Sequence, residues 1–204
     1  MALTIYGSPR SRTIRVLWMA AELGLEYEHV PLEAADPALK SPAFLKLNPA
    51  GAVPTIVDDG FALAESTALN LYLAKTYGCG GLYPPTAHAE AGVWRWSLWA
   101  QAHLEPWLQR DASTAELRAQ AGESMAQLAL ASLQVLDAAL TGREWLVGDD
   151  FTVADLNVAG VLSPSRTAEL DLEPFGAVQR WRSACYQRPA ALAARQGLTA
   201  ARRS

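Results

Sequence analysis

The spacing of apolar residues changes repeatedly along residues 1–78, which indicates a mixture of strands and helices. Short apolar runs predict strands at residues 3–6, 27–32, 55–57 and 61–64. Apolar residues at helical spacing predict helices at residues 9–23, 42–47 and 65–77. The turn Asp58-Asp59-Gly60 separates the last two strands, and Asp-Gly between two apolar runs is typical of a hairpin. We therefore expect an α/β domain with the order β-α-β-α-β-β-α.

The first predicted helix has signals at both of its ends. Ser8 is placed as the N-cap, Pro9 as the first helical residue and Gly24 as the stop. Arg10, Arg12 and Arg15 follow within the first two turns, where the helix dipole disfavours cations. Attraction of an anionic ligand explains these three cations, and so does simple solvation or pairing with a nearby carboxylate.

After residue 87 the strand signals disappear, and the remaining chain predicts helices only. Pro106 predicts a bend or break in the first of them. Capping boxes begin two others: residues 113–116 read STAE, and Thr152 is followed by Asp155. We expect an α/β domain at residues 1–78, a linker rich in glycine and proline at 79–86, and an all-α helical bundle at 87–204.

Composition narrows the possible functions. The net charge of −4 gives no reason to expect a nucleic-acid partner. No positively charged start leads into an apolar run, and no apolar stretch reaches the roughly 18 residues that span a bilayer, so we expect no signal peptide and no membrane partner. Cys79 and Cys185 form no CxxC motif, and the three histidines have no metal-ligand spacing. We therefore expect no metal and a reducing, cytoplasmic location.

Pro54 is unusual, because it stands at the entrance of what reads as a core strand. One interpretation is an edge strand with an ordinary trans bond before the proline. The other is a cis Val53–Pro54 bond, which would turn the peptide of Val53 outward to pair with an extended peptide.

Four segments together resemble the cytosolic glutathione S-transferase family, across essentially the whole chain. They read LTIYGSPRSRTIRVLW, NPAGAVPTI, FALAESTALNLYLA and FTVADL. The resemblance is to bacterial, serine-type members of the phi and theta kind. It implies a thioredoxin-like first domain, a helical second domain, a cis Val53–Pro54 bond and glutathione as co-substrate.

The resemblance also implies a set of glutathione-binding residues. The backbone of Val53, before Pro54, would hold the cysteine of glutathione. Glu65 would take the ammonium group, and Ser66 at a helix start would bind the γ-glutamyl carboxylate. Ser66 as a simple helix cap is the alternative. Lys40 matches a position that binds the glycine carboxylate in some relatives, although a lone lysine is equally a solvated surface residue. Arg12 is a further candidate for binding this anionic ligand.

Three hydroxyls are candidates for stabilising the glutathione thiolate: Ser11, Ser8 and Tyr6. A free thiol has a pKa of about 8.5, so a donor near a helix N-terminus must favour the anion. Ser8 is expected to cap the helix, and Tyr6 to pack in a strand. Ser11, three residues after Ser8, is expected to face outward, and Pro9-Arg10-Ser11 resembles the catalytic serine phrase of serine-type relatives. We assign the catalytic role to Ser11, with Ser8 in reserve.

The helical half offers little polar chemistry. Trp96 and Trp99 share a helix face and either line an apolar electrophile pocket or simply pack in the core. The resemblance implies a glutathione transferase that conjugates glutathione to small hydrophobic electrophiles in detoxification, as a homodimer. The alternatives are a glutathione-dependent isomerase, dehalogenase or peroxidase, and a non-catalytic interaction module with the same fold.

Overall fold

The computed structural model describes residues 2–108, 123–164, 167 and 170–200. It divides into two compact units, Met1–Cys79 with Gln187–Ser204, and Gly80–Tyr186. The capping box expected at residues 113–116 lies outside the described residues.

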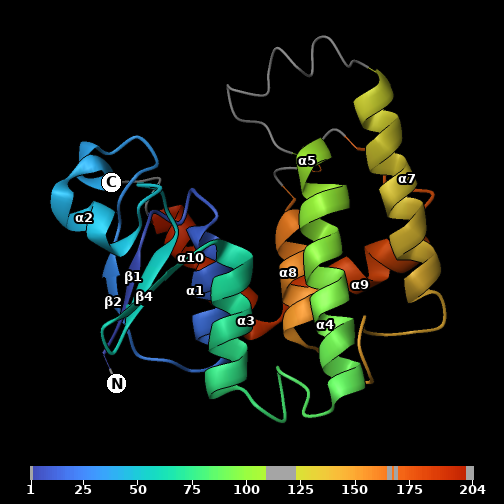
Figure 1. Cartoon of the computed structure of the whole chain (residues 1–204). Coiled ribbons are helices and arrows are strands. Elements are labelled where there is room, and N and C mark those ends of the chain that lie inside the picture. The colour runs from blue at the N-terminus through green and yellow to red at the C-terminus, as the bar shows by residue number, and fades with distance from the viewer. Residues whose placement is uncertain (1, 109–122, 165–166, 168–169, 201–204) are drawn as a thin grey trace. The chain divides into compact units, whose positions relative to one another are not determined.

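The first unit is built on a sheet of four strands in the order β2-β1-β3-β4 (Figure 1). The strands are β1 (Leu3–Tyr6), β2 (Glu28–Val30), β3 (Thr55–Asp58) and β4 (Phe61–Ala64). β1 pairs with β2 in parallel, whereas the pairs β1–β3 and β3–β4 are antiparallel. This thioredoxin-like arrangement confirms the fold expected from the sequence.

Helices cover both faces of this sheet (Figure 1). They are α1 (Thr13–Glu22), η1 (Pro37–Lys40), α2 (Pro42–Leu47), α3 (Ser66–Tyr77) and α10 (Pro189–Ala200). Phe44 of α2 packs edge-on against Tyr6 of β1, with 5.7 Å between the ring centres. α1 and α3 pack together on the other face, where Val16, Met19, Leu69 and Leu73 are completely buried.

The expected start of the first helix is wrong by four residues. α1 begins at Thr13, and the preceding Arg12 makes no side-chain capping bond. The Ser8 hydroxyl instead accepts from the backbone N–H of Arg10 at 3.2 Å. A serine hydroxyl can bond its own backbone two residues on, and here that local turn replaces a helix cap.

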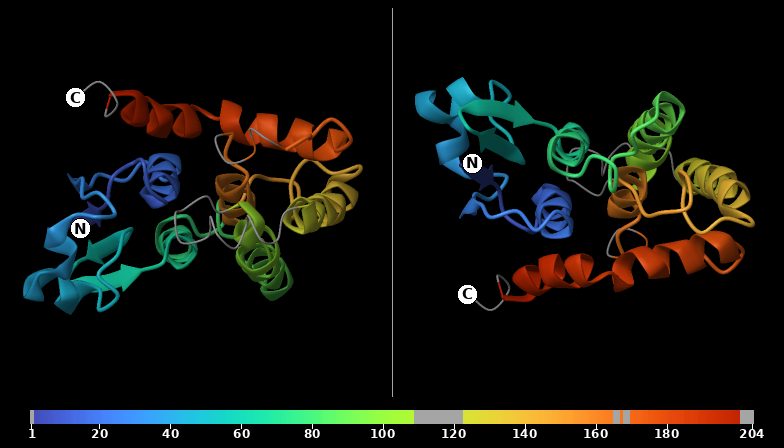
Figure 2. Two further views of the ribbon diagram at one scale, coloured as in Figure 1. Left: turned by 90° about the horizontal axis from the view of Figure 1, so that it is seen from above. Right: turned by 90° about the horizontal axis from the view of Figure 1, so that it is seen from below.

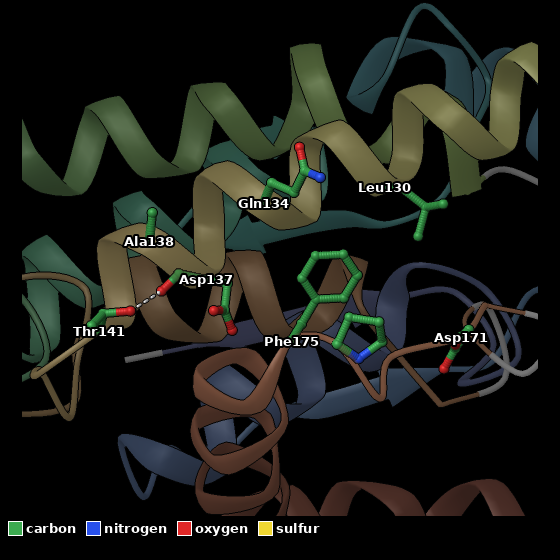
Figure 3. Close-up of a pocket in the computed structure, with 8 residues that line it drawn as sticks. Leu130, Gln134, Asp137, Ala138, Thr141, Asp171 and Phe175 are labelled. Carbon is green, nitrogen blue, oxygen red and sulfur yellow. Dashed lines mark hydrogen bonds between the residues drawn. The ribbon is translucent and has the colours of Figure 1, made fainter.

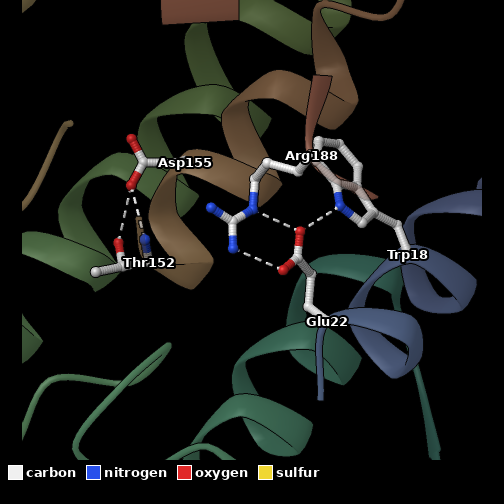
Figure 4. A network of polar contacts seen from close by, with 5 residues as sticks. All are labelled: Trp18, Glu22, Thr152, Asp155 and Arg188. Atoms are coloured by element: carbon white, nitrogen blue, oxygen red, sulfur yellow. Dashed lines mark hydrogen bonds and ion pairs between the residues drawn. The ribbon is translucent and has the colours of Figure 1, made fainter. Parts of the chain in front are cut away.

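The last helix belongs to the first unit, whereas the sequence places residues 87–204 in a single helical domain. α10 packs against α1, and Arg188 before it forms a bidentate ion pair with Glu22 at 2.7 and 2.8 Å (Figure 4). The indole N–H of Trp18 donates to the same carboxylate at 2.9 Å. Only 6% of the Glu22 side chain is exposed, so this three-residue cluster is a strong attachment of the C-terminal segment.

The hairpin is attached to α3 through one buried carboxylate. Tyr72 and Tyr77 donate to the same oxygen of Asp58, at 2.9 and 2.6 Å. The bond to Asp58, followed by burial, raises the pKa of Tyr77 well above its usual value of 10.0. Burial, followed by the same carboxylate, raises the pKa of Tyr72.

A raised tyrosine pKa in the folded state predicts sensitivity to alkali. The contribution of Tyr77 is complete below its unfolded pKa near 10 and is lost as the pH rises toward the folded pKa. We expect Tyr77→Phe to lower the free energy of unfolding at pH 8 by about 1.5 kcal/mol, because a bond to a charged group is removed. Urea titrations at pH 8 and above pH 10 should show a difference from wild type that shrinks at the higher pH. A constant difference would contradict this assignment.

The second unit is a bundle around one buried helix (Figure 2). Its described elements are α4 (Ala87–Trp99), η2 (Ala100–Leu104), α5 (Glu105–Leu108), α7 (Glu123–Leu140), α8 (Val153–Val161) and α9 (Gly176–Gln187). All nine residues of α8 are buried, which is typical of a helix at the centre of a bundle. η2 is a π-helical turn that ends two residues before Pro106, a proline that has no N–H for the α-helical ladder.

The predicted capping box of α8 is present, and its carboxylate, Asp155, also accepts hydrogen bonds from outside the capping box. Asp155 is completely buried and accepts from the N–H and hydroxyl of Thr152 at 2.9 and 3.1 Å (Figure 4). It also accepts from the backbone of Leu146 at 2.9 Å and from the indole of Trp181 at 2.8 Å. Burial raises the pKa of the Asp155 carboxyl, while these four bonds act in the opposite direction.

No helix within the described part of the chain is both long and apolar enough to cross a membrane.

Candidate functional site

Three loops of the first unit meet at one end of the sheet because of strand register. Thr55 of β3 pairs with Tyr6 of β1 on one side and with Ala64 of β4 on the other. The chain segments just beyond these three residues therefore emerge side by side. They are residues 7–13 after β1, Val53–Pro54 before β3, and Glu65–Ser66 after β4.

Gly7 allows two of these segments to approach closely. A Cβ atom at Gly7 would lie 2.1 Å from the Thr13 hydroxyl and 2.9 Å from the Cβ of Val53. Its φ of +129° is a further reason for glycine. The ring of His29 on β2 donates from Nε2 to the Gly7 carbonyl at 2.9 Å. The loop that carries the candidate serines is therefore packed directly against Val53, and the Val53–Pro54 bond is cis.

The two candidate serines differ in exposure and bonding. Ser8 is 2% exposed and its hydroxyl is used in the turn, whereas Ser11 is half-buried. The Ser11 hydroxyl donates to the Ser8 carbonyl at 2.8 Å and accepts from the Thr13 N–H at 3.1 Å. It also lies 2.8 Å from the Thr13 hydroxyl. Ser11 is thus the more accessible serine, although it is not the free side chain that the sequence suggests.

Glu65 adopts a backbone conformation that is rare for a residue with a side chain. Its φ of +72° is strained for glutamate and occurs immediately before α3. The first intrahelical bond runs from Leu69 to the Glu65 carbonyl, so the N–H groups of the first turn, including Ser66, point out of the helix end. Such an end attracts anions, and Glu65 makes no side-chain capping bond there.

The loop that leads to Val53 is held by two polar side chains. Asn48 donates to the Ala52 carbonyl at 2.9 Å and to the Thr55 hydroxyl at 3.1 Å. Lys40 donates to the carbonyls of Ala50 and Gly51 at 3.1 and 3.0 Å. An ammonium group has three N–H donors, so these bonds leave one N–H of Lys40 for a ligand.

Arginines surround the serine loop. Arg10 is exposed, Arg12 is half-buried immediately before α1, and Arg15 is 3% exposed within it. Arg12 is therefore close in sequence and in space to Ser11, whereas burial makes Arg15 part of the helix packing.

Trp96 and Trp99 lie in the second unit. Trp96 is 4% exposed and meets Trp99 edge-on, with ring centres 5.2 Å apart, which supports packing for Trp96. An open groove of about 610 Å³ elsewhere in this unit lies between α7 and the segment before α9 (Figure 3). It is lined by Gln134, Asp137, Asp171 and Phe175 among others, and none of the predicted site residues is among its lining.

Sequence reasoning missed Gly7 and Thr13, whose importance comes from the approach of the serine loop to Val53. The available signal was a threonine two residues after Ser11 together with a glycine directly after the first strand. No group of three or more histidine, cysteine, aspartate or glutamate side chains is placed to hold a metal among the residues that the structure describes.

Comparisons with known proteins find two family models that match this chain. A family model described as the glutathione S-transferase N-terminal domain matches residues 1–75. A second model, described as the glutathione S-transferase C-terminal domain, matches residues 98–189.

Individual relatives match three quarters of the chain or more. Glutathione S-transferase 3 of Zea mays is 35% identical over 204 residues, which cover 92% of this chain and 90% of that protein. Glutathione S-transferase GST-4.5 of Xanthomonas campestris is 36% identical, covering 76% of this chain and 78% of that protein. A crystal structure of a glutathione S-transferase from Xanthobacter autotrophicus superposes with a TM-score of 0.77 at 30% identity, covering 92% of this chain and 94% of that one.

Proposed function

Because the chain belongs to the glutathione S-transferase family, we propose that its first unit binds glutathione and presents the thiolate to a small apolar electrophile. The observation that carries this proposal is the convergence of the serine loop, Val53–Pro54 and Glu65–Ser66 at one end of the sheet. Glutathione has an ammonium, two carboxylates and a thiol, and the proposal assigns each of these groups a partner near this end of the sheet.

The two ends of the peptide would be held by charge. Glu65 takes the γ-glutamyl ammonium, while Ser66 and the first N–H groups of α3 bind the adjacent carboxylate. The backbone of Val53 pairs with the cysteine of glutathione, as a short added strand would. Lys40 binds the glycine carboxylate with its remaining N–H, and Arg12 adds positive potential.

Ser11 would act on the sulfur. Its hydroxyl turns from the Ser8 carbonyl to the glutathione sulfur and stabilises the thiolate by a charge-assisted bond. A thiolate held next to a bound electrophile reacts through proximity and through its lowered pKa. Within the second unit, the half-buried Trp99 is a better candidate for an apolar electrophile surface than the buried Trp96.

Membership of the family supports a proposal for the assembly and setting of the protein. We propose a cytoplasmic homodimer with a role in detoxification. The apolar residues exposed on the first unit include Phe61, which is 52% exposed at the end of the edge strand β4 and contacts Tyr72. An exposed aromatic ring of this kind suits an interface with a second copy.

One experiment tests the function directly. Glutathione affinity and conjugation of chlorodinitrobenzene are measured for the wild-type protein. We expect binding and turnover. Binding without conjugation of any of a panel of electrophiles would favour the isomerase, dehalogenase or peroxidase alternatives or a binding role. No binding of glutathione would reject the proposed function altogether.

Lys40 gives a second, more local test. We expect Lys40→Met to weaken glutathione binding about tenfold, since one charge-assisted bond to a carboxylate is lost. The matched ligand is γ-glutamylcysteine, which lacks the glycine carboxylate, and the variant should bind it as wild type does. Equal weakening for both ligands would show that Lys40 acts only by holding the carbonyls of Ala50 and Gly51.

A further inference from the structure

The Thr13 hydroxyl is buried behind the candidate catalytic serine. Thr13 has no exposed surface, and its hydroxyl lies 2.8 Å from the hydroxyl of Ser11. The backbone N–H of Thr13 also donates to the Ser11 oxygen, at 3.1 Å. Two polar groups of one buried residue therefore converge on the atom proposed to act on glutathione.

Counting protons fixes the direction of the hydroxyl bond. Ser11 has a single hydroxyl proton, and it donates that proton to the Ser8 carbonyl. The Thr13 hydroxyl must then be the donor to Ser11. In the opposite arrangement the buried Thr13 proton would be left without its acceptor, which is unfavourable.

We propose that Thr13 is a positioning residue that directs the Ser11 proton toward the glutathione sulfur. The inference rests on the proposed function of Ser11. The N–H and the hydroxyl of Thr13 then both donate to the Ser11 oxygen. The Ser11 hydroxyl proton remains available to be donated to the glutathione sulfur. A hydroxyl that accepts two bonds is polarised by them and becomes a stronger donor.

The hydrogen bond from the Ser11 hydroxyl to the Ser8 carbonyl can break without leaving that carbonyl unpaired. The Ser8 carbonyl also accepts from the Ser11 backbone N–H, at 3.0 Å. When the Ser11 hydroxyl turns to the thiolate, this carbonyl keeps a partner and no buried group is orphaned. Both bonds from Thr13 remain in place during the turn, because they involve the oxygen of Ser11 and not its proton.

Gly7 keeps the Thr13 hydroxyl in this position. Any side chain at residue 7 would place its Cβ 2.1 Å from that hydroxyl and would push it away. The same glycine contacts Val53, so the hydroxyl pair is packed against the loop proposed to hold the glutathione cysteine.

The test compares Thr13→Val, which keeps the shape and removes the hydroxyl, with Thr13→Ser, which keeps the hydroxyl. The ultraviolet absorbance of the thiolate is titrated against pH for glutathione bound to each protein. Affinity for S-methylglutathione, which has no ionisable thiol, reports on binding alone. We expect Thr13→Val to raise the bound thiol pKa by about one unit, a tenfold loss of thiolate at low pH. We expect S-methylglutathione affinity to stay within about twofold and Thr13→Ser to match wild type.

The possible outcomes separate this inference from the proposed function. A lowered thiol pKa in wild type that Thr13→Val leaves unchanged would overturn the role of Thr13 alone. Equal loss of S-methylglutathione binding in both variants would overturn it as well, in favour of a packing role. If the thiol pKa of glutathione bound to the wild-type protein is not lowered below that of free glutathione, the proposed function and this inference are both overturned. If Thr13→Val does not fold, Thr13→Ala against Thr13→Ser makes the same comparison.

Discussion

Replacing Asp155 by alanine is expected to lower the free energy of unfolding of the second unit by at least about 4 kcal/mol, because several buried donors lose their acceptor together. Those donors are the N–H and hydroxyl of Thr152, the N–H of Leu146 and the indole of Trp181. They come from three separate segments, so the carboxylate ties the start of α8 to α9 and to the preceding loop. Urea unfolding followed by circular dichroism measures the loss.

The matched control is Asp171→Ala in the same unit. Asp171 is exposed, and the bond that its carboxylate is seen to accept comes from the N–H of Glu173 at 2.9 Å. We expect this variant to lose less than about 1 kcal/mol. If Asp155→Ala lay within about 1 kcal/mol of Asp171→Ala, the buried network would not be the organising feature of the second unit.

Ser11→Ala is expected to lower kcat/KM for conjugation about 100-fold at pH 6.5, which matches the loss of one preorganised donor to a developing anion. The glutathione dissociation constant should change little, because the contacts proposed for Glu65, Ser66 and Lys40 do not involve Ser11. The loss should shrink as the pH rises toward the pKa of a free thiol, about 8.5, where thiolate forms without help. Steady-state kinetics across this pH range measures both effects.

Ser8→Ala distinguishes the two serines. The Ser8 hydroxyl accepts from Arg10 in a turn and is 2% exposed, so we expect a loss of less than tenfold, without the pH dependence. A large, pH-dependent loss in Ser8→Ala together with near-normal Ser11→Ala would assign the thiolate to Ser8.

Local features of the fold could be predicted from the sequence. Three signals each depend on a few neighbouring residues: the Asp-Gly turn, the Thr152–Asp155 capping box and the short apolar runs. The structure has the hairpin, the capping box and the strands that they predict. The start of α1 could not be predicted this way, since a serine followed by a proline suits both a helix cap and a tight turn. The attachment of α10 also could not, because Glu22 and Arg188 are 166 positions apart.

For a similar reason, only part of the candidate site could be predicted from the sequence. Ser11, Val53 and the Glu65–Ser66 pair came from the resemblance, and strand register explains why the segments that carry them lie at one end of the sheet. Thr13 and Gly7 carry no chemical signal of their own. Their importance appears only when the serine loop is packed against Val53, which is a property of the fold and not of a motif.

An ultraviolet difference spectrum at pH 6.5 tests most directly whether the first unit holds glutathione as a thiolate. Free glutathione with a thiol pKa near 8.5 is only about 1% thiolate at this pH. We expect that adding glutathione to the wild-type protein produces a thiolate band corresponding to about half of the bound ligand or more. Saturating binding without such a band, or no binding at all, would contradict it.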